Sequence, residues 1–318
     1  MPTSHSARWE THTNDPMNPA KRRPVAPALL LLLALAAITA PRASAQLMVK
    51  MKLKKTSYVA YEPMSASVTV YNRAGQDIVL GGPNGRSWLS FDVYKDGQLL
   101  SPREGGTGLR TFVLGAGKSI TKSVDLNRVY PVADYGAYTI SAAVYFPPLR
   151  NYFSSAKARI QVFDSKPFWR QSVGVSQGAA RLASFREYSL FEHRDGTSAD
   201  VYVRLRDVRG ARVYCTFSLG RYINVRRPQA TIDTQNRLHV LHLSDPTLYT
   251  HSKIGSDGSF LGREFYKESE RSRPTLVMDP GGVVRVVGGL PYDPEKAATA
   301  TAAAKKPRMA TERPPGLP

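Results

Sequence analysis

Histidines are the first residues of this 318-residue chain to suggest chemistry, since imidazole nitrogen is a common ligand of zinc. His239 and His242 lie three positions apart in a segment whose composition predicts a β-strand. Side chains alternate between the faces of a strand, so this spacing places the two imidazoles on opposite faces. His242, Asp245 and His251 could converge across a hairpin, but the helical His-Glu-x-x-His arrangement is absent. We therefore expect half-exposed strand histidines, with no metal and no other cofactor.

Three aspartates, Asp233, Asp257 and Asp279, raise the question of glycoside cleavage, which uses paired carboxylates. Each stands in a turn context, where an aspartate usually accepts hydrogen bonds from nearby backbone amides. The letters G-x-S-x-G at 174–178 lack the strand–turn–helix setting of a nucleophilic serine. The sequence thus predicts structural roles for Asp233 and Asp279 and no catalytic residue.

Aromatic residues gather in one short segment together with two prolines. Rings in a loop at the end of a sheet can stack on sugars or hold a peptide, and plain packing of the loop is the alternative. The candidate binding residues are Tyr145, Phe146, Tyr152 and Phe153.

The first 45 residues have the features of a secretory signal peptide. A basic stretch, 21–23, precedes the apolar run 28–40, and small residues, Ala43 and Ala45, stand at −3 and −1 of the expected cleavage site. The apolar run is too short to span a membrane. We expect export by the Sec route to the periplasm or beyond, with Met17 as an alternative start. No membrane-spanning segment is expected after cleavage.

The charge and cysteine content restrict the classes of partner. The chain carries a formal net charge of +19 and one cysteine, Cys215, so it forms no internal disulfide. A positive field of this size attracts anionic surfaces, which suggests an anionic envelope polymer. The basic residues are spread along the chain rather than gathered on one helix, which together with export argues against nucleic acid. A protein partner, or charge that serves solubility alone, remains open.

The segment 46–165 reads as an antiparallel β-sandwich. Apolar residues alternate with polar ones over 47–54, 64–71, 89–94 and 138–146, which places one face of each strand in a core. Turn residues separate these runs, and Asp96-Gly97 between two of them is a hairpin signal. Seven or eight short strands in this length suit a sandwich.

One motif in this segment resembles immunoglobulin-like domains. The run from Asp134 through Tyr138 to Ile140 follows the pattern D-x-G-x-Y-x-C, with isoleucine in place of the cysteine. The resemblance implies that the Tyr138 hydroxyl bonds back to upstream backbone as a tyrosine corner. The stretch 58–75 is also similar to macroglobulin-type domains of bacterial surface proteins.

The second half is predicted to begin with a linker, 166–184, followed by an all-β region, 185–292, that contains a repeat. Residues 227–241 match 273–287 at an offset of 46, pairing Pro228 with Pro274 and Asp233 with Asp279. A period of 40–50 residues with strand, turn and strand resembles the blades of sialidase-like propellers. The region is too short for a closed propeller. The tail, 293–318, is rich in alanine and proline and is predicted to be disordered.

These patterns together favour an exported, non-enzymatic binding or structural protein of a bacterial cell envelope. A secreted enzyme that hydrolyses glycans or peptides with the repeat region is the first alternative. A protease inhibitor acting through the loop at 145–153 is the second.

Overall fold

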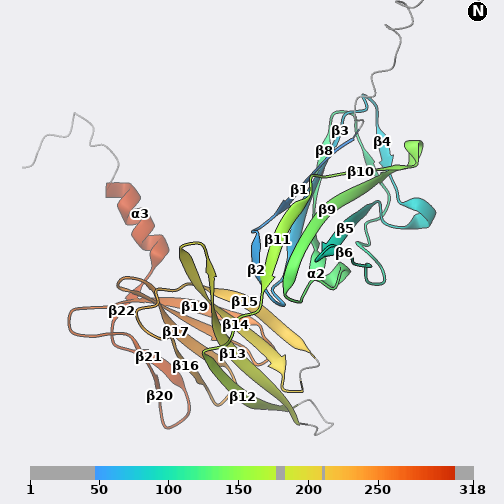
Figure 1. Cartoon of the computed structure of the whole chain (residues 1–318). Coiled ribbons are helices and arrows are strands. Elements are labelled where there is room, and N and C mark those ends of the chain that lie inside the picture. The colour runs from blue at the N-terminus through green and yellow to red at the C-terminus, as the bar shows by residue number, and fades with distance from the viewer. Residues whose placement is uncertain (1–46, 177–182, 210–211, 305–318) are drawn as a thin grey trace, which may run out of the picture. The chain divides into compact units, whose positions relative to one another are not determined.

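The computed structural model describes residues 47–176, 183–209 and 212–304, and these form several antiparallel β-sheets (Figure 1). The expectation of an all-β protein is confirmed, and no sheet of the described residues closes into a barrel or a propeller. The predicted signal peptide, with its cleavage residues Ala43 and Ala45, lies outside the described residues. No helix within the described ranges is long and apolar enough to cross a membrane.

Residues 47–163 form a three-stranded sheet, a six-stranded sheet and a two-stranded ribbon. The first contains β1 (Leu47–Leu53), β3 (Ser65–Asn72) and β8 (Ser119–Asp125). The second has the order β2 (Ser57–Val59), β11 (Ala158–Phe163), β9 (Gly136–Phe146), β5 (Leu89–Lys95) and β6 (Gln98–Leu99), with β10 (Asn151–Ser154) paired to β9. The ribbon pairs β4 (Ile78–Leu80) with β7 (Phe112–Leu114). All these pairs are antiparallel except β2 with β11.

Three short helical turns complete this part of the chain. They are η1 (Pro83–Gly85), α2 (Leu126–Val129) and η2 (Pro147–Leu149). The helix α2 begins where the Asp125 side chain accepts a hydrogen bond from the Asn127 amide, 3.0 Å away, which is the usual way to satisfy an exposed amide at a helix start.

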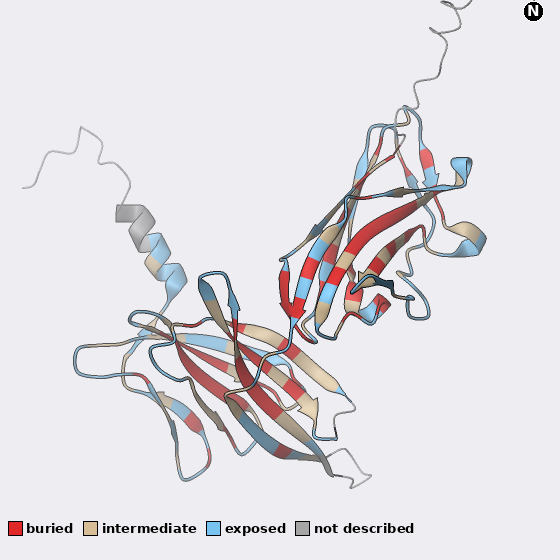
Figure 2. Cartoon of the chain, viewed as in Figure 1, coloured by how far each residue is buried: buried red, intermediate tan, exposed pale blue. Residues whose placement is uncertain are grey.

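Period-2 patterning explains why these segments become strands. In β11, Ile160 and Val162 are buried whereas the residues between and after them are exposed (Figure 2). The predicted hairpin at Asp96-Gly97 joins β5 to β6, and both turn residues have positive φ, 48° and 86°. A two-residue loop with both residues left-handed matches the twist of the flanking strands.

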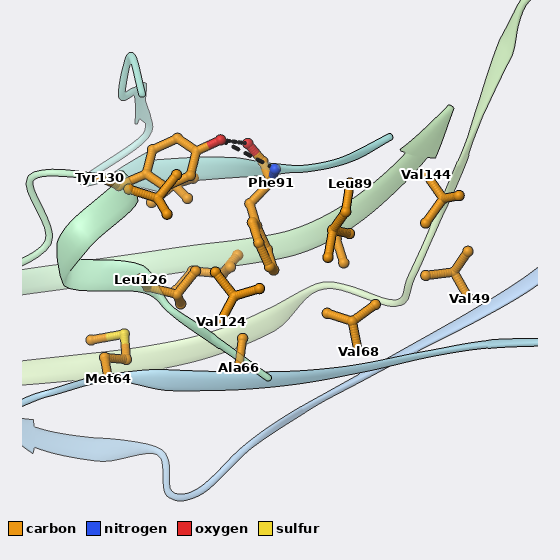
Figure 3. Packing of buried hydrophobic residues seen from close by; sticks show 14 of the residues in the cluster. Val49, Met64, Ala66, Val68, Leu89, Phe91, Val124, Leu126, Tyr130 and Val144 are labelled. Carbon is orange, nitrogen blue, oxygen red and sulfur yellow. Dashed lines mark hydrogen bonds between the residues drawn. The ribbon is translucent and has the colours of Figure 1, made fainter. Parts of the chain in front are cut away.

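A single large hydrophobic core fills the space between these strands. Met64, which precedes β3, and Ala66 and Val68 of β3 approach Leu89 and Phe91 of β5, as Figure 3 shows. The largest side chain in it, Trp88, is 1% exposed. Burying apolar surface at about 25 cal/mol per Å² is the main stabilising contribution to such a core.

Residues 169–292 form three further sheets. The first is a four-stranded meander of β12 (Trp169–Ser176), β13 (Ala183–Asp195), β14 (Ser198–Asp207) and β15 (Val213–Arg221). The second has the order β16 (Gln229–Ile232), β17 (Leu238–Asp245), β18 (Leu248–Ile254), β19 (Phe260–Lys267) and β22 (Leu290–Tyr292). The third is the hairpin of β20 (Thr275–Met278) and β21 (Val284–Val287).

The second sheet packs against the other two, one on each face. Leu238, Val240 and Ile254 join the core with the first sheet, which contributes Tyr188 and Leu205. The opposite face places an apolar cluster against the hairpin; its members are Leu241, Leu243 and Tyr249, with Ile223, Tyr266, Leu276 and Val286 packed around them.

The predicted linker, 166–184, is wrong at 169–176 and at 183–184, which are strand residues, and its residues 177–182 lie outside the described residues. Residues 169–176 form β12, which pairs with β13 from Trp169↔Leu190 to Ser176↔Ala183. The segment lacks clean periodicity because it is an edge strand, exposed along much of its length. Val173 is its buried core residue, and Trp169 and Val175 are only partly buried against the core.

The 46-residue repeat is present as two copies of one hairpin. Asp233 and Asp279 each donate and accept the same turn hydrogen bonds, and the residues three positions later, Asn236 and Gly282, both have positive φ. A left-handed residue is needed there, and asparagine and glycine are the residues that adopt it at least cost.

The tail, 293–318, was predicted to be disordered, but its residues 294–304 form a helix, and 305–318 lie outside the described residues. Helix α3 (Pro294–Ala304) starts at Asp293, whose Oδ1 accepts hydrogen bonds from the amides of Glu295 and Lys296, 3.0 and 3.2 Å away. A capping aspartate, a proline at the first helical position and an alanine run together favour a helix.

Candidate functional site

A cleft opens on the sandwich beside β5, with a volume of about 530 Å³. Two connections form its walls: the segment around η1 and the loop between β6 and β7. Its lining combines charged, hydroxyl and aromatic groups, among them Arg86, Ser87, Ser90, Arg103, Glu104, Thr107, Tyr130 and Tyr152. A concave site with a few polar groups over an apolar floor is the usual form of a ligand pocket.

Side-chain hydrogen bonds to the backbone hold the β6–β7 loop in place. The buried Trp88 donates from Nε1 to the carbonyl of Arg110, 3.0 Å away. The Thr107 hydroxyl donates to the Leu89 carbonyl at 2.6 Å and also contacts the Ser87 hydroxyl. These bonds fasten the C-terminal half of the loop to the start of β5.

The floor of the cleft is rigid because Tyr130 is tied to β5. Its hydroxyl donates to the Phe91 carbonyl at 2.5 Å and accepts from the Phe91 amide at 3.1 Å, as the dashed lines in Figure 3 show. Burial raises the pKa of this phenol, so it stays protonated at physiological pH. Tyr130 therefore acts as a fixed surface and not as an acid or base.

The positive charges of the cleft are uncompensated. Arg86 and Arg103 are exposed, and neither guanidinium forms an ion pair or a side-chain hydrogen bond with any of the described residues. Glu104 is the single acidic residue in the lining. Free guanidinium groups bind carboxylate or phosphate through two parallel hydrogen bonds.

The predicted aromatic group divides between surface and core. Tyr152 is 48% exposed and lines the cleft, with the ring of Tyr145 packed on it at 5.0 Å between centroids. Phe146 is buried and meets Phe153 edge to face at 6.0 Å. The structure therefore brings one of the four residues, Tyr152, into the candidate site, supported by Tyr145.

The residues given structural roles occupy turns and strand starts. Tyr138 donates from its hydroxyl to the Asp134 carbonyl at 2.8 Å, and burial raises its pKa to about 12. Asp233 accepts from the amides of Gln235 and Arg237, and Asp279 accepts from the amide of Val283. Pro228 directly precedes β16, and Pro274 directly precedes β20.

The expectation of half-exposed histidines is wrong: His239, His242 and His251 are all buried, 1–3% exposed. His239 and His242 lie on opposite faces of β17, as alternation requires, and the ring nitrogens of His242 have no hydrogen-bond partner among the described residues. His239 instead meets His251 of the neighbouring strand, with Nδ1 and Nε2 3.1 Å apart. This pair depends on the register of β17 and β18, so periodicity in the sequence does not reveal it.

The side chains around these two rings lie in a row and do not converge on one point. His239 Nε2 lies 3.1 Å from Asp233 Oδ2, and His251 Nδ1 lies 3.1 Å from Glu264 Oε2. No group of three or more histidine, cysteine or acidic side chains in the described part of the chain is arranged to hold a metal ion.

Comparisons of the sequence with known proteins find no match. No protein-family model matches the chain, and no curated protein matches it. Among solved structures, it is similar to Spo0M, a sporulation control protein from Bacillus subtilis, at 11% identity and a TM-score of 0.25. That match covers 55% of this chain and 91% of Spo0M.

Proposed function

We propose that this chain is an exported, non-enzymatic binding protein of a bacterial cell envelope, and that its sandwich cleft holds a segment of an anionic polymer. The observation that carries the proposal is the pair of unpaired arginines, Arg86 and Arg103, at a cleft with an exposed tyrosine, Tyr152. Guanidinium groups select oxyanions, and an aromatic ring offers a stacking surface for a sugar or a linker.

The overall charge supports an anionic ligand. The chain from Gln46 onward has 39 basic and 23 acidic residues, and its net charge of +16 produces a field that raises the local concentration of polyanions and speeds their encounter with the cleft. Polymers that carry carboxylate or phosphate groups, such as uronate chains or polyol phosphates, fit this chemistry. The sequence pattern of 21–45 supports export, which would place the protein where such polymers occur.

We also infer an immunoglobulin-like or macroglobulin-type relationship for 46–165 and a blade-like one for the repeat region. The backbone bond of Tyr138 supports the first, and successive antiparallel meanders support the second. A fold relationship of either kind would supply a scaffold and not an activity.

Neither alternative function has a specific observation in its favour. A hydrolase in the repeat region would need free carboxylates, but the oxygens of Asp233, Asp257 and Asp279 accept hydrogen bonds from their own turns. The hairpin of β9 and β10 exposes Leu149 and Tyr152 and buries Phe146, and none of its contacts favours a protease over another partner.

Binding to defined polymers tests the proposal. The chain beginning at Gln46 would be titrated with polygalacturonate, poly(glycerol phosphate) and neutral dextran by calorimetry at low salt. We expect binding to one or both polyanions, loss of it in Arg86→Ala/Arg103→Ala, and retention in Arg73→Ala/Arg159→Ala. The control removes two exposed arginines of the same sandwich outside the cleft. Equal loss in both double variants would show charge attraction without a site and would overturn the proposal.

A further inference from the structure

Four side chains form a continuous hydrogen-bonded row on one face of the second sheet. The row runs from Asp233 at the β16–β17 turn to His239 on β17, His251 on β18 and Glu264 on β19. Each of its three links measures 3.1 Å between heavy atoms. Three members are buried, at 5%, 3% and 1% exposure along the row, while the side chain of Glu264 is 47% exposed.

The number of hydrogens on the four side chains limits how many of the three links can be hydrogen bonds. Three links need three hydrogens, and ionised carboxylates donate none. Each neutral imidazole carries one N–H, so two neutral rings supply two hydrogens. One of the three links is therefore without a hydrogen until the row takes up one more proton.

The central link, between His239 and His251, is the one that lacks a hydrogen. A hydrogen bond to a carboxylate is charge-assisted and stronger than one between neutral rings, so His239 donates from Nε2 to Asp233 and His251 donates from Nδ1 to Glu264. This leaves His239 Nδ1 and His251 Nε2 with lone pairs directed at each other.

The geometry of the central link suits a proton and not a metal ion. The ring centroids lie 5.3 Å apart, which is about the N···N distance plus the radii of the two rings. The two rings therefore meet edge to edge and in line, with their planes 22° from parallel. An ion in line between two nitrogens would need them roughly 4 Å apart, twice a zinc–nitrogen distance. At 3.1 Å the gap matches an N–H···N hydrogen bond.

We propose that Asp233, His239, His251 and Glu264 form a proton-operated latch between β17 and β18. Its central link is open when both rings are neutral, and uptake of a single shared proton closes it as the medium becomes acidic. The exposed carboxylate of Glu264 gives that proton a path from solvent to the buried rings. The latch does not depend on the ligand cleft of the sandwich.

The surroundings of the rings determine the pH at which the latch closes. Burial lowers the pKa of both His239 and His251, and the carboxylates beside them oppose that shift. Closure is therefore expected below neutral pH.

The other groups that face the row are few. Arg237 binds Asp233 at 2.6 Å, Lys253 binds Glu264 at 2.9 Å, and the Tyr266 hydroxyl donates to Glu264 at 3.2 Å. The hairpin packed on this face contributes the apolar side chains of Leu276 and Val286.

Nitrogen NMR of the imidazoles tests the latch in the chain that begins at Gln46. At pH 8 we expect opposite tautomers, Nε2–H at His239 and Nδ1–H at His251. As the pH falls below neutral, the two rings should titrate together and share one proton. His242, whose pKa burial lowers to about 4, should stay neutral throughout and serves as the internal reference.

Glu264→Gln supplies the missing donor. Its amide can donate to His251 Nδ1, which turns His251 to the Nε2–H tautomer and fills the central link without a proton. We expect this tautomer switch and the loss of the shared titration, whereas Glu187→Gln, a strand glutamate of another sheet, should leave both unchanged. The same His251 tautomer in wild type and Glu264→Gln, or independent one-proton titrations of the two rings, would overturn the proposal.

Discussion

Asn236 and Gly282 occupy the same position in two copies of one turn, with φ angles of 59° and 75°. Each amide donates to the carbonyl three residues earlier, Asp233 or Asp279, at 3.0 and 2.8 Å. The backbone needs a left-handed residue at this point, and the two copies meet that need with different side chains. The repeat is therefore a repeat of backbone geometry, with the aspartate carboxylates capping the turn.

Gly282→Ala should destabilise the protein more than Asn236→Gly. A Cβ at position 282 would lie 2.1 Å from Thr234 Cγ2 in a backbone region that alanine disfavours. We expect a loss of about 1–3 kcal/mol in the free energy of unfolding. Asn236→Gly removes only an exposed hydrogen bond to the Gly174 carbonyl, so about 0.5 kcal/mol is expected. Urea unfolding measures both; a larger loss for Asn236→Gly would contradict this account.

Asn72→Asp should destabilise the sandwich severely. The buried Asn72 donates from Nδ2 to the carbonyls of Gln76, Leu114 and Gly115 at 2.8–2.9 Å, and its Oδ1 accepts from the Ala74 amide. Aspartate has the same shape but no donor, so a carboxylate would face three carbonyl oxygens. Leaving these groups unpaired costs on the order of 3 kcal/mol or more.

Thermal and urea unfolding at pH 7 measure this loss. Asn151→Asp is the matched control, because Asn151 is exposed and its Oδ1 accepts only from the next amide. Equal stability of the two variants would show that the Asn72 network contributes little.

His242→Leu should make stability less sensitive to acid. Burial lowers the pKa of His242 to about 4, below the value near 6.5 of an unfolded histidine. The unfolded chain therefore binds the extra proton first, and the folded state loses stability as pH falls from 6.5 towards 4. Between pH 7.5 and pH 4.5 the wild type should lose roughly 2–3 kcal/mol more than the variant.

Chemical unfolding at the two pH values gives this difference directly. At pH 7.5 the leucine should be tolerated or mildly stabilising, since both ring nitrogens of His242 lack partners within the described structure. An identical pH dependence in wild type and variant would show that His242 is accessible to protons in the folded state.

Two changes should lower the affinity for a polyanion: substitution of a cleft arginine and a higher salt concentration. Each arginine of the cleft, Arg86 or Arg103, is expected to contribute about 1.5–3 kcal/mol through charged hydrogen bonds, so each alanine variant should raise Kd by about 10-fold or more. Raising salt from 0.05 to 0.5 M should weaken the wild type more than the double variant, because exposed charges are screened. Calorimetric titration measures both, and equal salt dependence would place the contact elsewhere.

The all-β class, the strands of the sandwich and the 46-residue repeat were predictable because each rests on local signals. Alternation in β11, the Asp96-Gly97 turn and the aspartate turns are properties of neighbouring residues. The predictions for two segments were wrong, each for its own reason. β12 is an exposed edge strand without a clear period, and α3 is set by the cap at Asp293 against a composition typical of disorder.

The candidate sites were only partly predictable. Tyr152 could be selected as an aromatic residue in a loop, but Arg86 and Arg103 belong to different connections that meet only when β5 and the β6–β7 loop are in place. His239 and His251 become neighbours through the register of two strands, which no spacing along the chain encodes.

The sequence by itself determined which segments of the sandwich become strands and where the repeated hairpins turn, because side-chain alternation and turn residues act over a few positions. Only the tertiary structure decided which charges stay unpaired and which imidazoles face each other. Those relationships arise from strand pairing and loop packing between residues distant in the chain, and burial then alters the pKa values that govern their chemistry.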